Sequence, residues 1–84
     1  EPSPPHLRLY PQPARHELCI DIDGSYPSQL RYELMDLSGR LLETGVLAHS
    51  CLSVSGLPTG SYILRLIPDS SHQHMSQIWI KGPG

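Results

Sequence analysis

Hydrophobic and polar residues alternate along most of the chain with a period of two, which is typical of β-strands that have one buried face. Short runs of glycine, proline, aspartate and serine separate the alternating stretches, and these residues form turns. The pattern predicts seven short strands, at residues 7–10, 16–22, 30–34, 41–45, 51–55, 61–67 and 75–81. Strands that recur about every ten residues predict an all-β fold, with two sheets packed face to face.

The side chains on the inward phase of these strands define the predicted core. They are Leu18, Ile20, Ile22, Leu30, Tyr32, Leu34, Leu52, Val54, Tyr62, Leu64 and Leu66. In the last strand we expect Gln77, Trp79 and Lys81 to face outward, with Trp79 as a contact point for a partner or as a cap on the end of the sandwich. The predicted architecture is an immunoglobulin-like antiparallel β-sandwich of about seven strands.

Glycine and proline mark the turns that shape this sandwich. Pro11 and Pro13 end the first strand and place it at a sheet edge, because proline has no N–H to donate to a neighbouring strand. Gly39 is expected to supply a positive φ in a hairpin. The Leu-Pro-Thr-Gly run at residues 57–60, followed by Tyr62, resembles the corner of immunoglobulin-like sandwiches in which a tyrosine hydroxyl binds the corner backbone.

Length and charge narrow the class of protein. Eighty-four residues make one domain. A net charge of -2 argues against a nucleic-acid partner, which requires clustered cations. No apolar run approaches the ~18 residues of a membrane span, so no transmembrane segment is expected. The proline-rich residues 1–6 read as a linker to a preceding domain, and residues 7–84 as the folded domain.

The sequence gives only weak evidence for a metal site or a catalytic site, and no enzyme is predicted. His72 and His74 have no third ligand at short spacing, so we expect a polar loop rather than a zinc site. Asp21 and Asp23 lack the further oxygen ligands that calcium needs. No nucleophile motif is present. We therefore expect no catalytic residue, no metal and no cofactor.

Cys19 and Cys51 leave two alternatives open. They lie on outward phases of the second and fifth strands, which are neighbours in one sheet of an immunoglobulin-like topology. A disulfide would require their Cα atoms to lie within about 7 Å of each other. Otherwise they are two partly covered, small apolar side chains.

Four motifs follow one another along the chain: Tyr-Pro-Gln-Pro-Ala at residues 10–14, Asp-Leu-Ser-Gly-Arg at 36–40, Leu-Pro-Thr-Gly-Ser-Tyr at 57–62 and Ile-Trp-Ile-Lys at 78–81. In this order they resemble the motifs of C-terminal sorting domains of the type IX secretion system. The resemblance covers nearly the whole chain from Leu7 onward. Two features depart from the family: Gln12 stands where asparagine is usual, which is expected to alter a side-chain hydrogen bond in the turn, and residues 82–84 extend beyond the last strand, where members usually end.

The resemblance implies a signal domain, not an enzyme. It implies that the parent protein is exported through the periplasm and across the bacterial outer membrane by a translocation machinery that engages the folded domain. In most members a sortase-like surface protease then removes the domain, with a cut expected here in residues 1–6, and can join the cargo to anionic lipopolysaccharide. Some surface components keep the domain, and the sequence leaves both cases open. The alternative is a fibronectin-III-like or immunoglobulin-like adhesion or accessory module of a secreted protein.

The same resemblance assigns roles to individual residues. The expected recognition residues are Ile78, Trp79, Ile80 and Lys81, on a last strand whose unpaired backbone groups would face a receptor at a sheet edge. The expected turn residues are Pro11, Pro13, Gly39, Leu57, Pro58, Gly60 and Tyr62.

Overall fold

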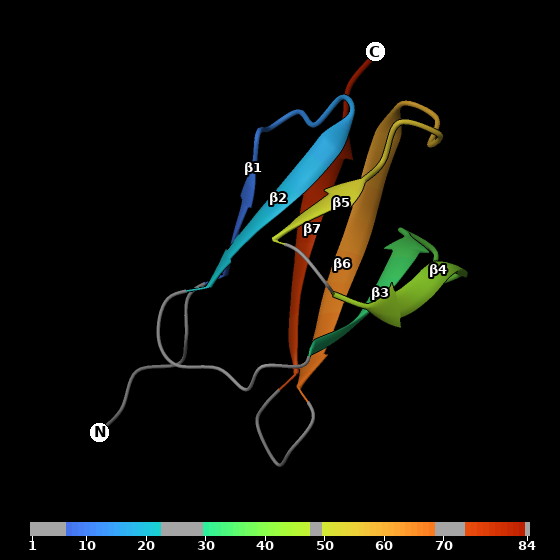
Figure 1. Cartoon of the computed structure of the whole chain (residues 1–84). Coiled ribbons are helices and arrows are strands. Elements are labelled where there is room, and N and C mark those ends of the chain that lie inside the picture. The colour runs from blue at the N-terminus through green and yellow to red at the C-terminus, as the bar shows by residue number, and fades with distance from the viewer. Residues whose placement is uncertain (1–6, 23–29, 48–49, 69–73, 84) are drawn as a thin grey trace.

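The chain forms seven strands, shown in the computed structural model of Figure 1, which describes residues 7–22, 30–47, 50–68 and 74–83. The strands are β1 (Leu7–Tyr10), β2 (Glu17–Ile22), β3 (Leu30–Asp36), β4 (Leu41–Val46), β5 (Cys51–Ser53), β6 (Gly60–Pro68) and β7 (Met75–Lys81). Each predicted strand is found at its predicted place, and the all-β fold is confirmed. The predicted linker at residues 1–6, the turn around Asp23 and the polar loop at residues 69–73 with His72 lie outside the described residues.

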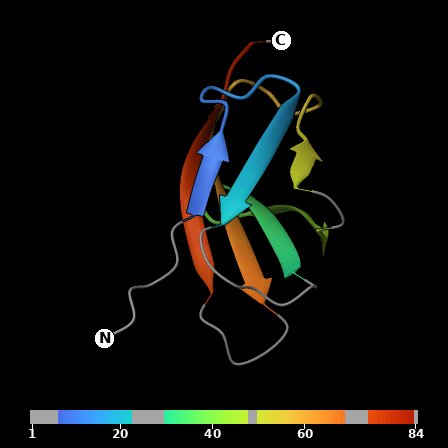
Figure 2. The same ribbon diagram turned by 60° about the vertical axis from the view of Figure 1, so that its left-hand side comes forward.

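The strands form two antiparallel sheets that face each other (Figure 2). One sheet has the order β1-β2-β5 and the other the order β4-β3-β6-β7. In constant-type immunoglobulin domains the fourth strand joins the sheet of the first two, whereas here β4 pairs with β3. The predicted edge position of β1 is confirmed, and this strand ends directly before Pro11.

The core lies between the sheets and contains most of the predicted side chains. Leu18, Ile20, Leu30, Tyr32, Leu34, Val54, Tyr62, Leu64 and Leu66 are buried, as predicted. Ile22 and Leu52 are only partly buried and pack against the margin of the core. Leu9, Ala14 and Trp79 are buried without having been predicted to be. The period-two assignment was therefore correct for β2, β3 and β6, and it failed in β7.

A disulfide joins Cys19 of β2 to Cys51 of β5. The two residues are direct partners in the register of these antiparallel strands, and they lie on the outward face of the three-stranded sheet, opposite to Leu18 and Ile20. Of the two alternatives for these cysteines, the disulfide is the one that forms.

Candidate recognition site

The last strand, β7, presents its tryptophan and its lysine to the interior of the sandwich. Trp79 is fully buried, and its ring stacks on the ring of Tyr62 in β6 with the centroids 5.2 Å apart. Lys81 follows on the same face and is only 2% exposed, and its Nζ donates to the carbonyl oxygen of Gly82 at 2.9 Å. The prediction that Gln77, Trp79 and Lys81 face outward is therefore wrong, because Gln77 too lies on the inward face, opposite the buried Leu64. The pairing of β7 with β6 decides the phase, because Trp79 lies opposite Tyr62 and opposite residues in a sheet share a face.

The outward face of β7 carries two isoleucines instead. Ile78 is 60% exposed and Ile80 is 49% exposed. Ile78 lies opposite Ile63, Ile63 opposite Met35, and Met35 opposite Leu41. These four residues form one line across all four strands, which we call the apolar row (Leu41, Met35, Ile63, Ile78). An apolar line of this length on a sheet surface is typical of an interaction site rather than of scattered surface residues.

A segment that follows β1 lies along the end of β7 and closes the edge there. The N–H of Ala14 donates to the carbonyl oxygen of Ile80, and the N–H of Gly82 donates to that of Ala14, each at 2.8 Å. Gln12 Oε1 accepts from the N–H of Ile80 at 3.0 Å. A Cβ on Gly82 would lie 3.0 Å from Cβ of Pro13, so a larger residue at position 82 would press against the clasp. We call residues 12–14 the clasp.

The clasp corrects the prediction for Gln12 and defines the open part of the edge. The Gln12 side chain binds β7 rather than an atom of its own turn. The N–H and C=O of Ile80 point to the clasp and thus away from β6. In an antiparallel strand every second residue has the same backbone orientation, so the N–H and C=O groups of Ile78 and Ser76 also point away from β6. Within the described ranges these groups of Ile78 and Ser76 have no hydrogen-bond partner. The predicted edge position of β7 is confirmed, with its open part restricted to this stretch.

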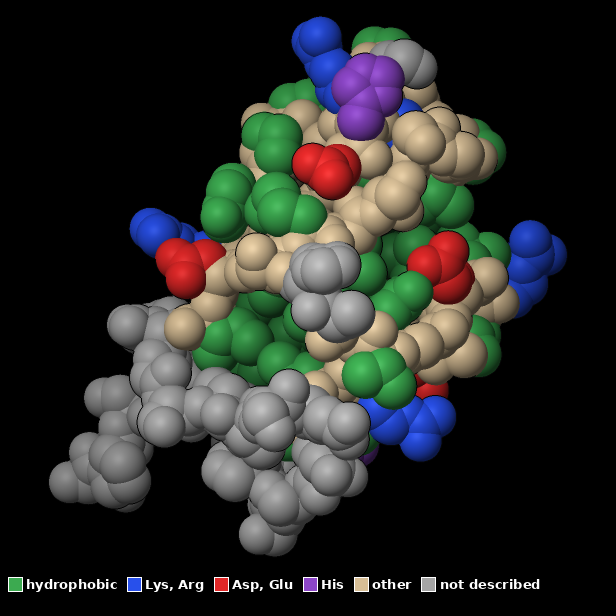
Figure 3. Space-filling model, viewed as in Figure 1, with side chains coloured by type: hydrophobic (Ala, Val, Ile, Leu, Met, Phe, Trp, Pro, Cys, Tyr) green, Lys and Arg blue, Asp and Glu red, His purple; other side chains and the backbone are tan. Residues whose placement is uncertain are grey.

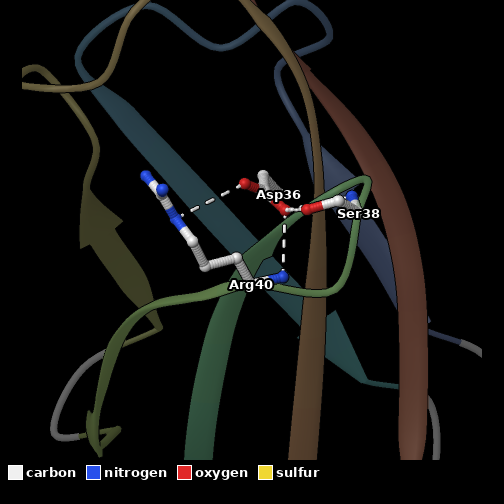
Figure 4. Close-up of polar contacts among 3 residues, drawn as sticks. All are labelled: Asp36, Ser38 and Arg40. Atoms are coloured by element: carbon white, nitrogen blue, oxygen red, sulfur yellow. Dashed lines mark hydrogen bonds and ion pairs between the residues drawn. The ribbon is translucent and has the colours of Figure 1, made fainter.

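The hairpin between β3 and β4 is organised by the carboxylate of Asp36 (Figure 4). Its Oδ1 accepts from the N–H and the hydroxyl of Ser38, at 3.0 and 2.6 Å, and from the N–H of Arg40 at 3.0 Å. These donors, the Ser38 hydroxyl foremost, hold the pKa of Asp36 below its ordinary value. Gly39 has a φ of +90°, which other residues rarely adopt, so its predicted role as the hairpin glycine is confirmed.

The corner before β6 has the predicted tyrosine contact. The hydroxyl of Tyr62 donates to the carbonyl oxygen of Pro58 at 2.6 Å. Leu57 is partly buried against the core, and its N–H donates to the carbonyl oxygen of Val54 at 3.1 Å. Gly60 is the first residue of β6. Residues 57–62 therefore fix the start of the central strand, and the structural role predicted for Tyr62 is confirmed.

One polar contact was not predicted. The hydroxyl of Tyr32 in β3 donates to Glu43 Oε2 in β4 at 2.6 Å, and this contact with the carboxylate raises the pKa of Tyr32 to about 12. Gly45 lies opposite Tyr32, and a Cβ there would lie 3.2 Å from the tyrosine ring. A β-bulge between Leu34 and Met35 shifts the register of β3 and β4. Because the contact depends on that shifted register, sequence alternation alone gives no signal for it.

No side-chain cluster in the described parts of the chain suggests catalysis. Figure 3 shows acidic and basic side chains scattered over one face of the molecule rather than gathered in a patch. Asp21 forms an ion pair with Arg8 at 2.9 Å. Among the described residues, the metal-ligand types that converge are Glu17, Cys19 and Cys51, and the two cysteines are bonded to each other. The described residues contain no helix that is long and apolar enough to cross a membrane.

Comparison with models of known protein families gives a match over most of the chain. The family model described as the secretion system C-terminal sorting domain matches residues 8–81. A comparison with curated proteins found no match. The matched range includes the clasp, the Asp36 hairpin, the tyrosine corner and β7, and it supports the sorting-domain reading and not the adhesion-module alternative. The role of this family is that of a signal and not of an enzyme. The chain therefore belongs to the secretion system C-terminal sorting domains, and its function is to direct the export of its parent protein by type IX secretion to the cell surface or the extracellular space.

Proposed function

We propose that the outer-membrane translocation machinery of type IX secretion recognises the folded domain through Ile78 and Ile80, on the outward face of β7. The observation that carries this proposal is the exposure of two large apolar side chains on a strand whose other face carries the buried Trp79 and Lys81. Partners bury such side chains because removal of apolar surface from water is the main favourable term in association.

The apolar row extends this contact surface away from β7. Ile63 and Met35 continue the line from Ile78 across the two central strands, where both are partly buried, and Leu41 ends it as an exposed side chain on β4. The row beside it is polar and contains Glu33, whose carboxylate lies 3.4 Å from Nη1 of Arg65. An apolar centre with a polar margin is the usual anatomy of a protein interface.

Trp79 and Lys81 act in this proposal as positioning residues. Trp79 fixes β7 against β6 by its stacking on Tyr62, and the buried Lys81 precedes the glycine that binds the clasp. The residues of the Ile-Trp-Ile-Lys motif thus divide by alternation. Ile78 and Ile80 contact the machinery, whereas Trp79 and Lys81 hold the strand in place.

The further partners follow from the family rather than from a contact in the domain. After translocation, a sortase-like surface protease cuts in the proline-rich residues 1–6, which form a linker to residues 7–84, and joins the new end of the cargo to anionic lipopolysaccharide. An extended, proline-rich segment fits a protease cleft better than a folded strand does.

A display experiment tests the recognition proposal. A passenger with an inner-membrane signal is fused to residues 1–84, and Ile78→Thr plus Ile80→Thr is compared with the wild type. Threonine keeps the preference for strand structure and removes apolar contact area. We expect surface display to fall about tenfold, the loss that corresponds to ~1.4 kcal/mol of binding.

A matched control separates recognition from folding. Leu37→Thr plus Val46→Thr changes two side chains that are 57% and 56% exposed and lie outside the apolar row. Both double variants should unfold within about 8 °C of the wild type, because each exposed substitution usually changes stability by ~0.5 kcal/mol or less. Equal display of the two double variants would show that the machinery recognises another surface of the domain.

A further inference from the structure

The strand β5 is attached to the sandwich by few contacts. It has three residues, Cys51–Ser53, and pairs only with β2 within the described chain. Figure 1 shows it as a short arrow beside β2 at the margin of its sheet. One hydrogen bond on each side continues the pairing, from the N–H of Ile20 to the carbonyl oxygen of Ser50 and from the N–H of Val54 to that of His16. An edge strand of this length is marginal without a further link.

The segment after β5 carries part of the core. Val54 is 2% exposed and lies among the buried residues, while Leu52 and Leu57 pack against them from the margin. Pro58 follows directly, and its carbonyl oxygen accepts the hydrogen bond from the Tyr62 hydroxyl. Detachment of β5 would therefore withdraw Val54 from the core and loosen the corner from which β6 begins.

The disulfide is the covalent link that holds this segment in place. It joins Cys51 to Cys19 at a sequence separation of 32 residues. Such a link restricts the unfolded chain, and its loss from a small exported domain often prevents folding. Cys19 also lines a shallow surface groove with Arg15, His16 and Glu17, so an external thiol or disulfide can reach the bond.

We propose that the Cys19–Cys51 disulfide makes the sorting signal dependent on oxidation: the oxidised domain is folded and exported, and the dithiol form is retained. The compartments outside the bacterial cytoplasm are oxidising, and the cytoplasm keeps thiols reduced. The bond therefore restricts the signal to chains that have already left the cytoplasm. This inference concerns the fold of the domain rather than the face that the machinery contacts, so it is separate from the recognition proposal.

The oxidation is a thiol–disulfide exchange with an oxidoreductase that carries a disulfide. One thiolate of the domain attacks a sulfur of the partner's disulfide, which forms a mixed disulfide and releases one partner thiolate. The second thiolate of the domain then displaces the partner, and the Cys19–Cys51 bond forms. The domain loses two electrons and two protons, and the partner's disulfide becomes two thiols.

The purified 84-residue chain tests whether folding of the domain depends on the disulfide. We expect the melting temperature, followed by circular dichroism, to fall by about 10 °C or more when the bond is reduced with dithiothreitol. The matched variant, Cys19→Val plus Cys51→Val, replaces the bond by a cross-strand pair of strand-forming residues, and reductant should not change its melting temperature. A reduced wild-type chain that melts within about 2 °C of the oxidised chain would overturn the proposal, whether or not the valine variant folds.

Surface display tests whether export of the domain depends on the disulfide. In cells treated with reductant, display of the wild-type fusion should fall at least about threefold, since this requires only ~0.7 kcal/mol. The valine variant should be displayed equally with and without reductant, which controls for damage to the machinery. Wild-type fusions displayed in full with both thiols free, as measured by alkylation and mass spectrometry, would overturn the proposal. The Ile78 and Ile80 variant keeps its disulfide, so a failure of the recognition proposal leaves this result unchanged.

Discussion

Tyr32 of β3 joins the core to the edge strand β4 through both its ring and its hydroxyl. Its ring is buried in the core and also covers Gly45 of β4, and its hydroxyl binds the carboxylate of Glu43 on the same strand. Glu43 thereby becomes a charge that points toward the core side at a sheet edge. Such inward charges protect edge strands from pairing with other chains, so one tyrosine both packs the core and holds the protecting group of β4 in place.

The tyrosine–carboxylate contact predicts a dependence of stability on alkaline pH. The pKa of Tyr32 rises to about 12 in the folded domain, whereas an unfolded tyrosine titrates near ~10. Folding therefore favours the protonated phenol. The contribution is complete below pH ~10 and is lost as the pH rises through about 12. Absorbance titration of tyrosinate should show that Glu43→Gln removes the most alkaline transition, and an unchanged titration curve would contradict the assignment.

At the scale of elements, β6 is the longer of the two central strands of the four-stranded sheet. It pairs with β3 on one side and with β7 on the other, and Tyr62, Leu64 and Leu66 are all buried on its inward face. Two local contacts, the tyrosine corner at its start and the Asp36 hairpin on β3, and one contact between distant segments, the clasp on β7, fix the elements around it. Stability should therefore depend most steeply on β6.

Truncation of a side chain on β6 measures this dependence. Leu64 is fully buried, so Leu64→Ala should lower the free energy of unfolding by roughly 2–5 kcal/mol, through lost apolar burial and the cavity that remains. Ile63→Ala, at the neighbouring position on the partly exposed face, serves as the control and should cost less. The comparison is made by denaturant unfolding. A larger loss for Ile63→Ala would contradict the burial order of the two faces.

The Asp36 hairpin should respond to acid. Because hydrogen bonds hold the pKa of Asp36 below its ordinary value, folding favours the carboxylate. Its contribution is present above the unfolded pKa of ~3.9 and is lost as the pH falls through the lower, folded pKa. The difference in melting temperature between wild type and Asp36→Ala should therefore be constant near neutral pH and shrink in acid. A difference that does not change with pH would show that the carboxylate charge has no part in the hairpin.

At the scale of the whole molecule, alternation predicted the strands, the sandwich and most of the core, because a strand with one buried face shows its period directly. It did not determine the phase of β7. Both faces of that strand carry apolar side chains, Ile78 and Ile80 on one and Trp79 on the other, so the pattern gives the period but not the inward side. The pairing with Tyr62 decides it, and pairing is a property of the fold.

The same limit applies to contacts between distant segments. The bond between Cys19 and Cys51 stayed open in the sequence, because spacing along the chain does not fix distance in space. The hydrogen bond from Ile80 to Gln12 joins residues 68 positions apart, and no local turn rule reaches that far. Alternation therefore gave the wrong facing for two of the four expected recognition residues, Trp79 and Lys81, and the site itself stays a prediction.

The clasp has a consequence for the order of events during synthesis. It joins a segment near the start of the domain to β7, the last of the seven described strands to be synthesised. A chain whose translation stops before Met75 lacks the partner of the clasp, the ring that stacks on Tyr62 and the two exposed isoleucines at once. We expect such chains to be absent from the cell surface when shortened and full-length passengers are compared by surface labelling. The sorting domain then acts as a check on translation: a passenger is exported only after its coding sequence has been read through the final strand.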